Sequence, residues 1–492
     1  MKACFKNNVP EAVSQITKTL KKANFEAFLV GGCVRDVLIG KKPKDWDVTT
    51  NASVEQIISL FPKTFYENNF GTVGVVNEDV TDETLKVVEV TPYRIDGAYS
   101  DKRHPDKVNF GKDLKEDLKR RDFTINALAF DCEEETLFDL YEGKNALVER
   151  VIQTVGNPDE RFQEDALRML RALRFSAELS FEIESSTALS LIKNRELLKF
   201  VSKERIRDEF IKIIISDNPK KGLELAKEAR IMSFILPELE EAYSIGQNKA
   251  HKYDVFEHLL RTLQCAADKK YPLEVRLAAL MHDIGKPRSK RWSDEKKEPT
   301  FYGHDVVSAR MAGIILERLK FSKKVIEDVV KLVRWHMFFS DTEQITLSAV
   351  RRMIANVGKD HIWDLMNLRL CDRVGTGRPK ENPYRLRKYK SMIDEAMHDP
   401  ISVGMLKIDG KDIISITKTQ PSPRIGYTLH ALLEEVLENP TLNTKEYLER
   451  RVIELNILSD GELRKIGESG REKKAKAEEE MVGEIRKKHW VE

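Results

Sequence analysis

The chain has 492 residues, which is too long for one hydrophobic core and predicts three or more folded units. Charged residues make up 33% of the chain while the formal net charge is only +2, which excludes a uniformly basic surface, so any contact with nucleic acid must depend on local clusters. The five cysteines are scattered, odd in number and without Cys-x-x-Cys spacing, which argues against a disulfide framework and against a zinc knuckle.

The first part of the chain, up to about Arg150, alternates between helix-like and strand-like patterns, which predicts a small α/β unit. Early in this unit an apolar run leads into Gly31-Gly32 and then into an amphipathic segment that contains Arg35. Glycine lets a backbone approach a phosphate closely, so a strand, a Gly-Gly turn and a helix start together indicate a phosphate site. A Gly-Gly pair alone is a weak signal.

Three acidic residues strengthen this interpretation. Asp45 and Asp47 are two residues apart, so on an extended strand their side chains face the same way. Glu89 lies in a β-branched run of strand composition, residues 87–91. Three carboxylates on neighbouring strands suit Mg²⁺ and a two-metal transfer of a nucleotide. An isolated Asp-x-Asp in a surface turn is the alternative for the pair alone.

Further motifs follow in chain order: EVTPYR from Glu89, RRDFTINALA from Arg120, and EDALR from Glu164. With them the sequence resembles the tRNA nucleotidyltransferases (CCA-adding enzymes) and bacterial poly(A) polymerases of the class II polymerase-β-like superfamily. The resemblance implies a polymerase-β-like head in which Asp45 and Asp47 are the catalytic Mg²⁺ ligands and Glu89 is the third carboxylate. The residues it implies for nucleotide binding are Gly31, Gly32, Arg35, Arg121, Asp122, Asn126, Arg161, Asp165 and Arg168.

The EDALR motif falls on a helical pattern that we expect to run from Arg161 to Phe175. Asp165 and Arg168 would then lie side by side, three residues apart. A carboxylate beside a guanidinium can pair with the Watson–Crick edge of cytosine or adenine. Uracil or guanine would leave buried polar groups without hydrogen-bond partners, which costs about 1 to 3 kcal/mol for each group. The resemblance implies that this pair is a protein template for CTP and ATP. An ordinary i,i+3 ion pair is the alternative.

Two further segments resemble the same family less specifically. The stretch from Tyr93-Arg94 to Arg103-His104-Pro105 lacks helical periodicity and resembles a flexible loop that helps the site change from CTP to ATP, although a plain exposed loop is nearly as good a description. Residues 202–209 resemble a motif that braces the neck helices, and we expect Glu204 and Arg205 to act there as helix-stabilising charges.

From Val151 onward the pattern is almost wholly helical, with apolar residues recurring every three or four positions. This part contains an ordered set of possible metal ligands: His258, His282, Asp283, His304, His336 and Asp372. The His-Asp pair within ALMHDIGKP resembles the HD metal-dependent phosphohydrolase superfamily. We expect His258, His282, Asp283 and Asp372 to hold a transition metal, with His304 and His336 as weaker candidates. A scaffold with inactive ligands is the alternative.

Near the end of the chain, IDGKD from Ile408 and PSPRIGY from Pro421 precede an amphipathic helix and resemble a tRNA-contacting tail. Arg424 is our candidate for an RNA phosphate contact, and a turn followed by a packing helix is the alternative. The domains we expect are a nucleotidyltransferase head at 1–150, a helical neck for base recognition at 151–245, an HD body at 246–380, a tRNA-binding tail at 381–460, and a charged segment at 461–492.

The fold class predicted is therefore an α/β polymerase-β-like head followed by an all-α neck, HD body and tail. The function it implies is template-independent addition of C, C and A to the 3′ end of tRNA from CTP and ATP. Alternatives are a poly(A) polymerase, a specialised A-adding or CC-adding enzyme, an HD phosphohydrolase with a silent head, or a non-catalytic RNA-binding module. The expected partners are tRNA, CTP and ATP, with the protein a monomer or homodimer. With no signal-peptide core and no apolar run near the ~20 residues of a membrane span, we expect it in the cytoplasm.

Overall fold

A computed structural model describes residues 8–66, 71–96, 108–111, 113–247, 252–338, 345–378 and 381–466. The chain divides into two compact units, one comprising residues 1–240 with 318–320 and the other comprising residues 241–317 with 321–492. In the described ranges no helix is both long and apolar enough to cross a membrane. The proposed loop between Tyr93 and Pro105 falls mostly outside these ranges.

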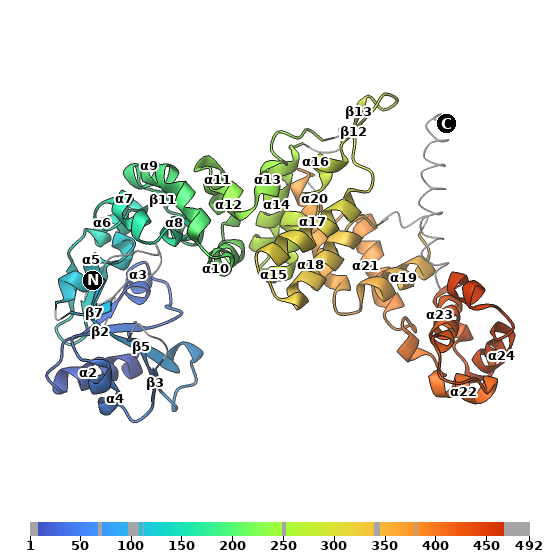
Figure 1. Cartoon of the computed structure of the whole chain (residues 1–492), viewed down its shortest axis with the longest axis horizontal. Helices are drawn as coiled ribbons and strands as arrows, with labels where there is room; N and C mark the ends of the chain where they lie inside the picture. Colours follow the sequence, from blue (N-terminus) through green and yellow to red (C-terminus); the bar gives the residue numbers. More distant parts are fainter. Residues whose placement is uncertain are drawn as a thin grey trace. The chain divides into compact units, whose positions relative to one another are not determined.

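The first unit is built on a seven-stranded mixed sheet with the order β3-β4-β5-β2-β1-β8-β9. Figure 1 labels β2, β3 and β5 of this sheet. Its strands are β1 (Ala27–Val30), β2 (Asp47–Thr50), β3 (Thr64–Tyr66), β4 (Val73–Val76), β5 (Val87–Pro92), β8 (Leu128–Asp131) and β9 (Thr136–Asp139). Strands β2 and β5 pair in parallel, whereas the other neighbours in the sheet are antiparallel. Strands β6 (Arg94–Asp96) and β7 (Val108–Phe110) form a separate antiparallel pair.

Short helices connect these strands. They are α2 (Glu11–Lys22), α3 (Gly32–Leu38), α4 (Val54–Leu60), η1 (Glu83–Leu85), α5 (Leu114–Lys119), η2 (Thr124–Asn126) and α6 (Gly143–Glu149). Ser53 and Gln56 close a capping box that starts α4 directly after β2. All four residues of β1 and all four of β8 are buried, so the centre of the sheet belongs to the core. The α/β head expected from the sequence is confirmed.

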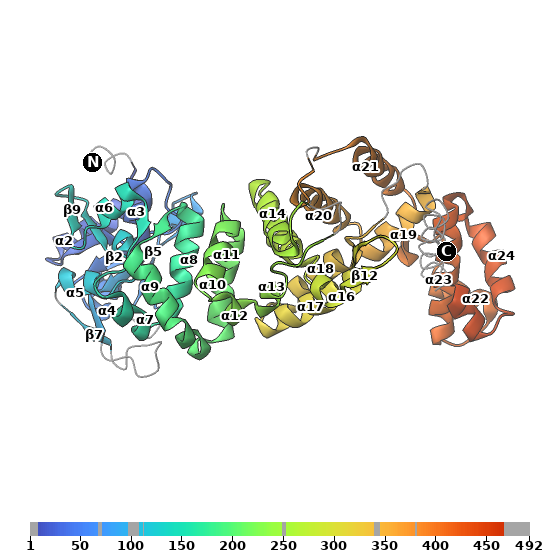
Figure 2. The same ribbon diagram turned by 90° about the horizontal axis from the view of Figure 1, so that it is seen from above.

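The helices that follow the head pack around α8, with α10 and α11 beside it (Figure 2). The elements are β10 (Val151–Ile152), α7 (Pro158–Glu164), α8 (Leu167–Leu179), β11 (Glu182–Ile183), α9 (Ser185–Asn194), η3 (Arg195–Phe200), α10 (Lys203–Ile215), α11 (Pro219–Glu228), α12 (Met232–Ile235) and α13 (Pro237–Glu240). The parallel pair of β10 and β11 is a small departure from the all-helical expectation.

The expectation of one helix from Arg161 to Phe175 is wrong. The helix ends at Glu164, and Asp165 adopts an extended backbone with φ −141° and ψ 105°. The Asp165 side chain accepts a hydrogen bond from the backbone N–H of Leu167, at 3.0 Å, where α8 begins. An aspartate that bonds to nearby backbone N–H groups competes with helical hydrogen bonds, which explains why the chain turns at this residue.

The second unit is mostly helical, as the sequence predicts. Its elements are α14 (Val255–Asp268), α15 (Leu273–Met281), α16 (Lys286–Ser289), β12 (Arg291–Ser293), β13 (Glu298–Thr300), α17 (His304–Arg318), α18 (Lys323–Trp335), α19 (Leu347–Val357), α20 (Ile362–Gly375), α21 (Tyr384–Ala396), η4 (Val403–Met405), α22 (Gly410–Thr417), α23 (Pro423–Glu438), η5 (Pro440–Leu442) and α24 (Lys445–Leu455). The β12–β13 hairpin was not anticipated.

Candidate active site and metal centre

The three carboxylates of the head meet at the junction of β2 and β5. In the parallel register Asp47 lies directly opposite Glu89. Asp45 precedes β2 by two residues and is exposed, whereas Trp46 between the two aspartates is buried. Burial and then the charges of Asp45 and Glu89 raise the pKa of Asp47 to about 7, and Arg121 only partly opposes them. The cluster therefore carries more negative charge than its surroundings neutralise. A bound divalent cation would reduce the repulsion among these carboxylates.

The Gly-Gly turn borders this cluster. Gly31 has φ +80° and ψ −131°, a conformation that side chains other than glycine rarely adopt. A Cβ at Gly31 would lie 3.0 Å from Nη1 of Arg121 and 3.8 Å from Oδ2 of Asp47. A Cβ at Gly32 would lie 4.0 Å from Oδ1 of Asp45. The two glycines therefore bring the backbone up to the carboxylates and to one arginine.

A chain of hydrogen bonds extends from the turn toward the neck. Arg35 is buried and donates from Nη1 to Oδ1 of Asn126 at 2.8 Å. Asn126 donates to Oδ1 of Asp122 at 3.2 Å, and Asp122 accepts from Nε of Arg171 at 2.6 Å. Burial alone would raise the pKa of Asp122, but the charges of Arg171 and Arg168 hold it at about 2. Arg171 was missed from the sequence, although it lies one helical turn after Arg168.

An acidic residue, also missed from the sequence, orients the neighbouring arginines. Asp117 is completely buried and accepts from Nη2 of Arg121 at 3.2 Å and from Nη2 of Arg120 at 2.7 Å. The backbone N–H of Arg94 donates to the same carboxylate at 3.2 Å. Arg120 and Arg121 follow Asp117 by three and four residues, so the spacing could have indicated this anchor. Asp117 holds Arg121 where it faces Gly31.

The structure does not pair Asp165 with Arg168. Nη1 of Arg168 forms an ion pair with Glu164, and its Nη2 donates to the carbonyl of Arg120 at 2.9 Å. Oδ2 of Asp165 instead accepts from Nη2 of Arg205, on α10, at 2.7 Å. Arg161 is also ion-paired with Glu164. The sequence led us to expect Arg205 only as a helix-stabilising charge, whereas it ties the neck helix to Asp165.

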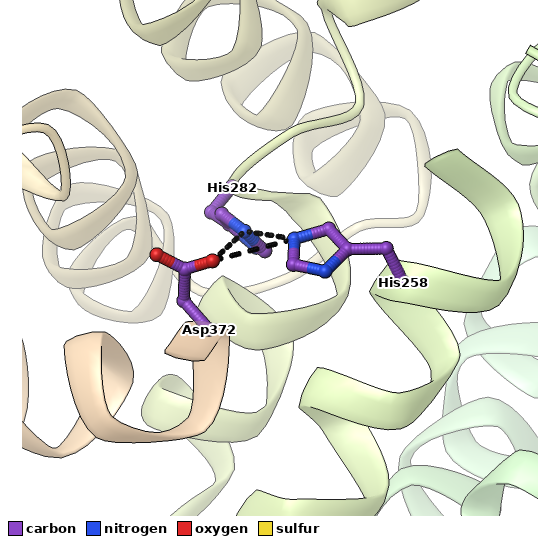
Figure 3. Close-up of side chains that lie close together, drawn as sticks. All are labelled: His258, His282 and Asp372. Carbon is purple, nitrogen blue, oxygen red and sulfur yellow. Dashed lines mark hydrogen bonds and ion pairs between the residues drawn. The ribbon is translucent and has the colours of Figure 1, made fainter. Parts of the chain in front are cut away.

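The helical body brings the six possible ligands of the HD motif into one buried cluster. His258 comes from α14, His282 and Asp283 follow α15, His304 starts α17, His336 ends α18, and Asp372 lies on α20. They form two groups whose ligand atoms lie within 4.8 Å of one another: His258, His282 and Asp372, and Asp283, His304 and His336. Figure 3 shows the imidazoles of His258 and His282 turned toward the Asp372 carboxylate.

Backbone carbonyls, which can only accept, fix which ring nitrogen of His282 and His336 carries a proton. Nδ1 of His282 lies 2.9 Å from the carbonyl of Ala279, and Nδ1 of His336 lies 2.7 Å from the carbonyl of Val333. The Nδ1–H therefore donates outward, and in a neutral ring the Nε2 lone pair points into the cluster. Burial would lower the pKa of His282, but the Asp283 charge and hydrogen bonds to both carboxylates raise it to about 10. The cluster thus attracts positive charge.

The candidate RNA contact in the tail is already engaged. Nη2 of Arg424 donates to the carbonyls of Asn456, at 3.0 Å, and Leu458, at 2.6 Å, and Nη1 pairs with Asp460. The guanidinium thus joins the start of α23 to the end of α24. This geometry favours the packing role that the sequence left open for Arg424.

Comparisons with known proteins agree with this arrangement. Family models match at residues 27–153 (Poly A polymerase head domain), 180–243 (Probable RNA and SrmB- binding site of polymerase A) and 255–360 (HD domain). The CCA-adding enzyme of Ligilactobacillus salivarius is 31% identical over 445 residues, 90% of this chain and 96% of the relative. That of Geobacillus stearothermophilus is 32% identical over 447 residues, 90% of this chain and 96% of the relative.

Solved structures give the same result. The crystal structure of the Bacillus stearothermophilus CCA-adding enzyme in complex with CTP has a TM-score of 0.69 and 28% identity, and the match covers 93% of this chain and 98% of that one. The Thermotoga maritima CCA-adding enzyme complexed with tRNA has a TM-score of 0.55 at 20% identity, which supports the fold alone, with 92% of this chain and 98% of that one covered. The chain therefore belongs to the family of CCA-adding enzymes and is a nucleotidyltransferase with a polymerase head and an HD domain.

Proposed function

We propose that this chain adds C, C and A in turn to the 3′ end of tRNA, using CTP and ATP and releasing pyrophosphate. The observation that carries the proposal is the cluster of Asp45, Asp47 and Glu89 beside the Gly31-Gly32 turn. The names of its full-length relatives favour CCA addition over poly(A) synthesis and over addition of only A or only C. The similar enzyme solved with CTP supports that nucleotide as a substrate.

In this proposal the three head carboxylates hold Mg²⁺, with Asp45 and Asp47 as its main ligands. The raised pKa of Asp47 fits such a site, because a bound dication would stabilise the ionised form that the protein alone disfavours. Bound Mg²⁺ would supply activation of the attacking 3′ hydroxyl and charge neutralisation on the departing pyrophosphate. What the chain's own residues do is to bind and orient the nucleotide.

The phosphates and ribose of the nucleotide are assigned to the arginine and amide groups around the turn. Arg121 faces Gly31 and is fixed by Asp117, so its guanidinium is oriented before a triphosphate arrives. Asp122 accepts a hydrogen bond from Asn126, and its ionised carboxylate can also accept from a sugar hydroxyl. Arg35 holds the Asn126 side chain in place. Preorganised donors of this kind lose little entropy when the ligand binds.

Base selection is assigned to Asp165 and Arg168, with Arg161 beside them. Here Arg168 is held by Glu164 and the Arg120 carbonyl, and Asp165 by Arg205. These partners orient the Arg168 guanidinium and the Asp165 carboxylate separately. The two side chains therefore need not pair with each other in order to hydrogen-bond to a base. Cytosine and adenine each present an amine and a ring nitrogen to such groups, whereas uracil and guanine present the opposite polarity.

The test is incorporation of labelled CTP and ATP, separately and together, onto a tRNA transcript that lacks its last three nucleotides, resolved at single-nucleotide length. We expect addition to stop after C, C and A. Asp45→Ala and Asp47→Ala should abolish incorporation while tRNA binding stays near the parent level. Asp79→Ala, an exposed acid in the same head, is the matched control and should be fully active. Long A tracts, or activity in Asp47→Ala, would contradict the proposal.

A second activity is favoured by the helical body. We propose that its HD cluster binds a transition metal and hydrolyses a phosphoester, since imidazole and carboxylate ligands together suit such metals. Asp372 is oriented by Arg369 at 2.5 Å, and Asp283 by Lys286 at 2.6 Å. Release of phosphate from a model phosphomonoester or a 2′,3′-cyclic nucleotide, with Mn²⁺ added, tests this. Loss of that activity in Asp372→Ala is expected, and equal activity in the variant would refute it.

A further inference from the structure

The acidic residues of the head belong to a row of residues that crosses the sheet from strand to strand. Asp47 on β2 lies opposite Glu89 on β5. Glu89 in turn lies opposite Gly74 on β4, and Gly74 lies opposite Phe65 on β3. Residues that are directly opposite on neighbouring strands present their side chains to the same face of the sheet. Phe65 therefore lies on the face that carries the carboxylates, two strands beyond Glu89.

The ring of Phe65 extends back across β4 toward these carboxylates. A Cβ at Gly74 would lie 2.5 Å from Cζ of Phe65 and 2.6 Å from its Cε1, so the far end of the ring fills the space of a side chain at this position. Neighbouring strands are about 4.8 Å apart, which places the end of the ring about one strand from Glu89. Phe65 nevertheless stays 40% exposed. An accessible aromatic ring thus lies beside the carboxylate cluster.

In the proposed reaction the triphosphate binds on the other side of the carboxylates. The Gly31-Gly32 turn follows β1, and β1 pairs with β2 along the edge that faces away from β5. Arg121 borders the same turn. In-line displacement at the α-phosphate puts the leaving pyrophosphate and the attacking hydroxyl on opposite sides. Because pyrophosphate leaves toward β1, the 3′ hydroxyl of the RNA approaches from β5 and β4, the side on which Phe65 lies.

A positive charge is found on the same part of this face. Thr91 follows Glu89 by two residues on β5 and therefore shares its face. The Thr91 hydroxyl donates to Oγ1 of Thr72 at 3.2 Å, and the same oxygen accepts from Nη2 of Arg94 at 2.8 Å. The Arg94 guanidinium is therefore held on the β4 and β5 side of the carboxylates, where its charge favours the phosphates of an RNA strand.

We propose that Phe65 is the surface on which the base of the 3′-terminal nucleotide of the acceptor RNA stacks. This inference rests on the nucleotidyl transfer proposed above and adds to it a residue that positions the acceptor. Every base has a π-face, so an aromatic ring holds a terminal nucleotide without reading its sequence. That tolerance suits an enzyme whose acceptor ends in a new nucleotide after each addition. A ring that only packs on Gly74 would need bulk but no aromatic face.

The experiment compares the full-length parent with Phe65→Leu and Phe65→Tyr. Both variants keep a bulky side chain over Gly74, but only tyrosine keeps an aromatic ring. The kcat/KM for a tRNA transcript without its last three nucleotides is measured at saturating CTP, and CTP binding is measured without RNA. Phe65→Leu should lower this kcat/KM about five- to tenfold, the lower end of the effect of one stacked base. Phe65→Tyr should stay near the parent, and CTP binding should be equal in all three.

A second acceptor tests whether the ring acts on the terminal base. It is the same transcript with no base on its 3′-terminal ribose, so its end cannot stack. The parent should use it about as poorly as Phe65→Leu uses the normal transcript, and Phe65→Leu should lose nothing further on it. Tyr66→Leu is the matched control, because Tyr66 is exposed on the same strand but points to the other face. It should match the parent on both acceptors.

The outcomes separate this inference from the function on which it rests. A parent that extends no tRNA would overturn the proposed function and the role of Phe65 together. A parent that adds C, C and A, with Phe65→Leu as active as the parent or impaired equally on both acceptors, would overturn the role of Phe65 alone. Weaker CTP binding in Phe65→Leu would assign the ring to the incoming nucleotide and would overturn it as well.

Discussion

Removing the charge of Asp47 should stabilise the metal-free head while abolishing catalysis. The pKa of Asp47 is about 7 in the folded chain, compared with an ordinary value of 3.8, because of burial and the charges of Asp45 and Glu89. At about 1.4 kcal/mol for each tenfold change, this difference corresponds to about 4 kcal/mol. Asp47 is only partly buried, so relaxation and solvent reduce the expected gain for Asp47→Asn to about 2 to 4 kcal/mol in a chelator at pH 8.

The pH dependence of this effect has a definite sign. A carboxyl group whose pKa is raised by folding binds its proton more tightly in the folded chain, so the destabilisation is complete above pH 7 and absent below 3.8. Between these values the stability of the parent should fall as pH rises. The advantage of Asp47→Asn should therefore shrink steadily from pH 8 to pH 4.

The assay is scanning calorimetry in chelator from pH 4 to pH 8, because a chain with two compact units does not unfold as one two-state system. The head transition is identified as the one that Mg²⁺ shifts upward in the parent at pH 8. Asp79→Asn makes the same chemical change on an exposed turn and should leave the temperature of the head transition unchanged. An Asp47→Asn head that is no more stable than the parent at pH 8, or whose advantage is constant with pH, would refute the reasoning.

Three other substitutions test separate parts of the structure. Gly31→Ala should cost about 1 to 3 kcal/mol in urea unfolding, because φ is +80°, and should raise KM for CTP because its Cβ would press on Arg121. Arg168→Ala should raise misincorporation of UTP more than it lowers tRNA binding, and unchanged base selectivity would remove Arg168 from the template. Gly375→Ala should lower the melting temperature and metal content of the helical body, since its Cβ would lie 2.1 Å from Oγ1 of Thr262; native metal content in that variant would contradict this.

Much of the head could be predicted because its signals are local. The Gly-Gly turn and the strand composition around Glu89 are visible in short windows, and both fall on the elements they indicate. The register of β2 against β5, which places Asp47 opposite Glu89, could not be predicted from the sequence, because strand pairing depends on the whole sheet. The break at Asp165 was missed because apolar periodicity continues through it, while one side-chain hydrogen bond overrides that pattern.

The sequence named candidate residues for each site, but it did not indicate which other side chains hold them in place. Asp117 and Arg205 were not assigned to any site. Asp117 orients Arg121 and Arg205 orients Asp165, and contacts of this kind depend on tertiary packing. In the helical body the sequence named all six candidate ligands, and the structure brings them into two neighbouring groups. Their division into two sets needed the packing of separate helices, which is why the sequence suggested one metal with two weaker histidines.

The strand order has a consequence for synthesis on the ribosome. Strands β1 and β2 form a local pair, but the next neighbours of both, β5 and β8, are made much later, so the sheet cannot close during early translation. Until residues 128–131 have emerged, the wholly apolar β1 presents one unpaired edge. A chain released between β5 and β8 would carry that edge into solution, where it can pair with the same strand of another unfinished copy.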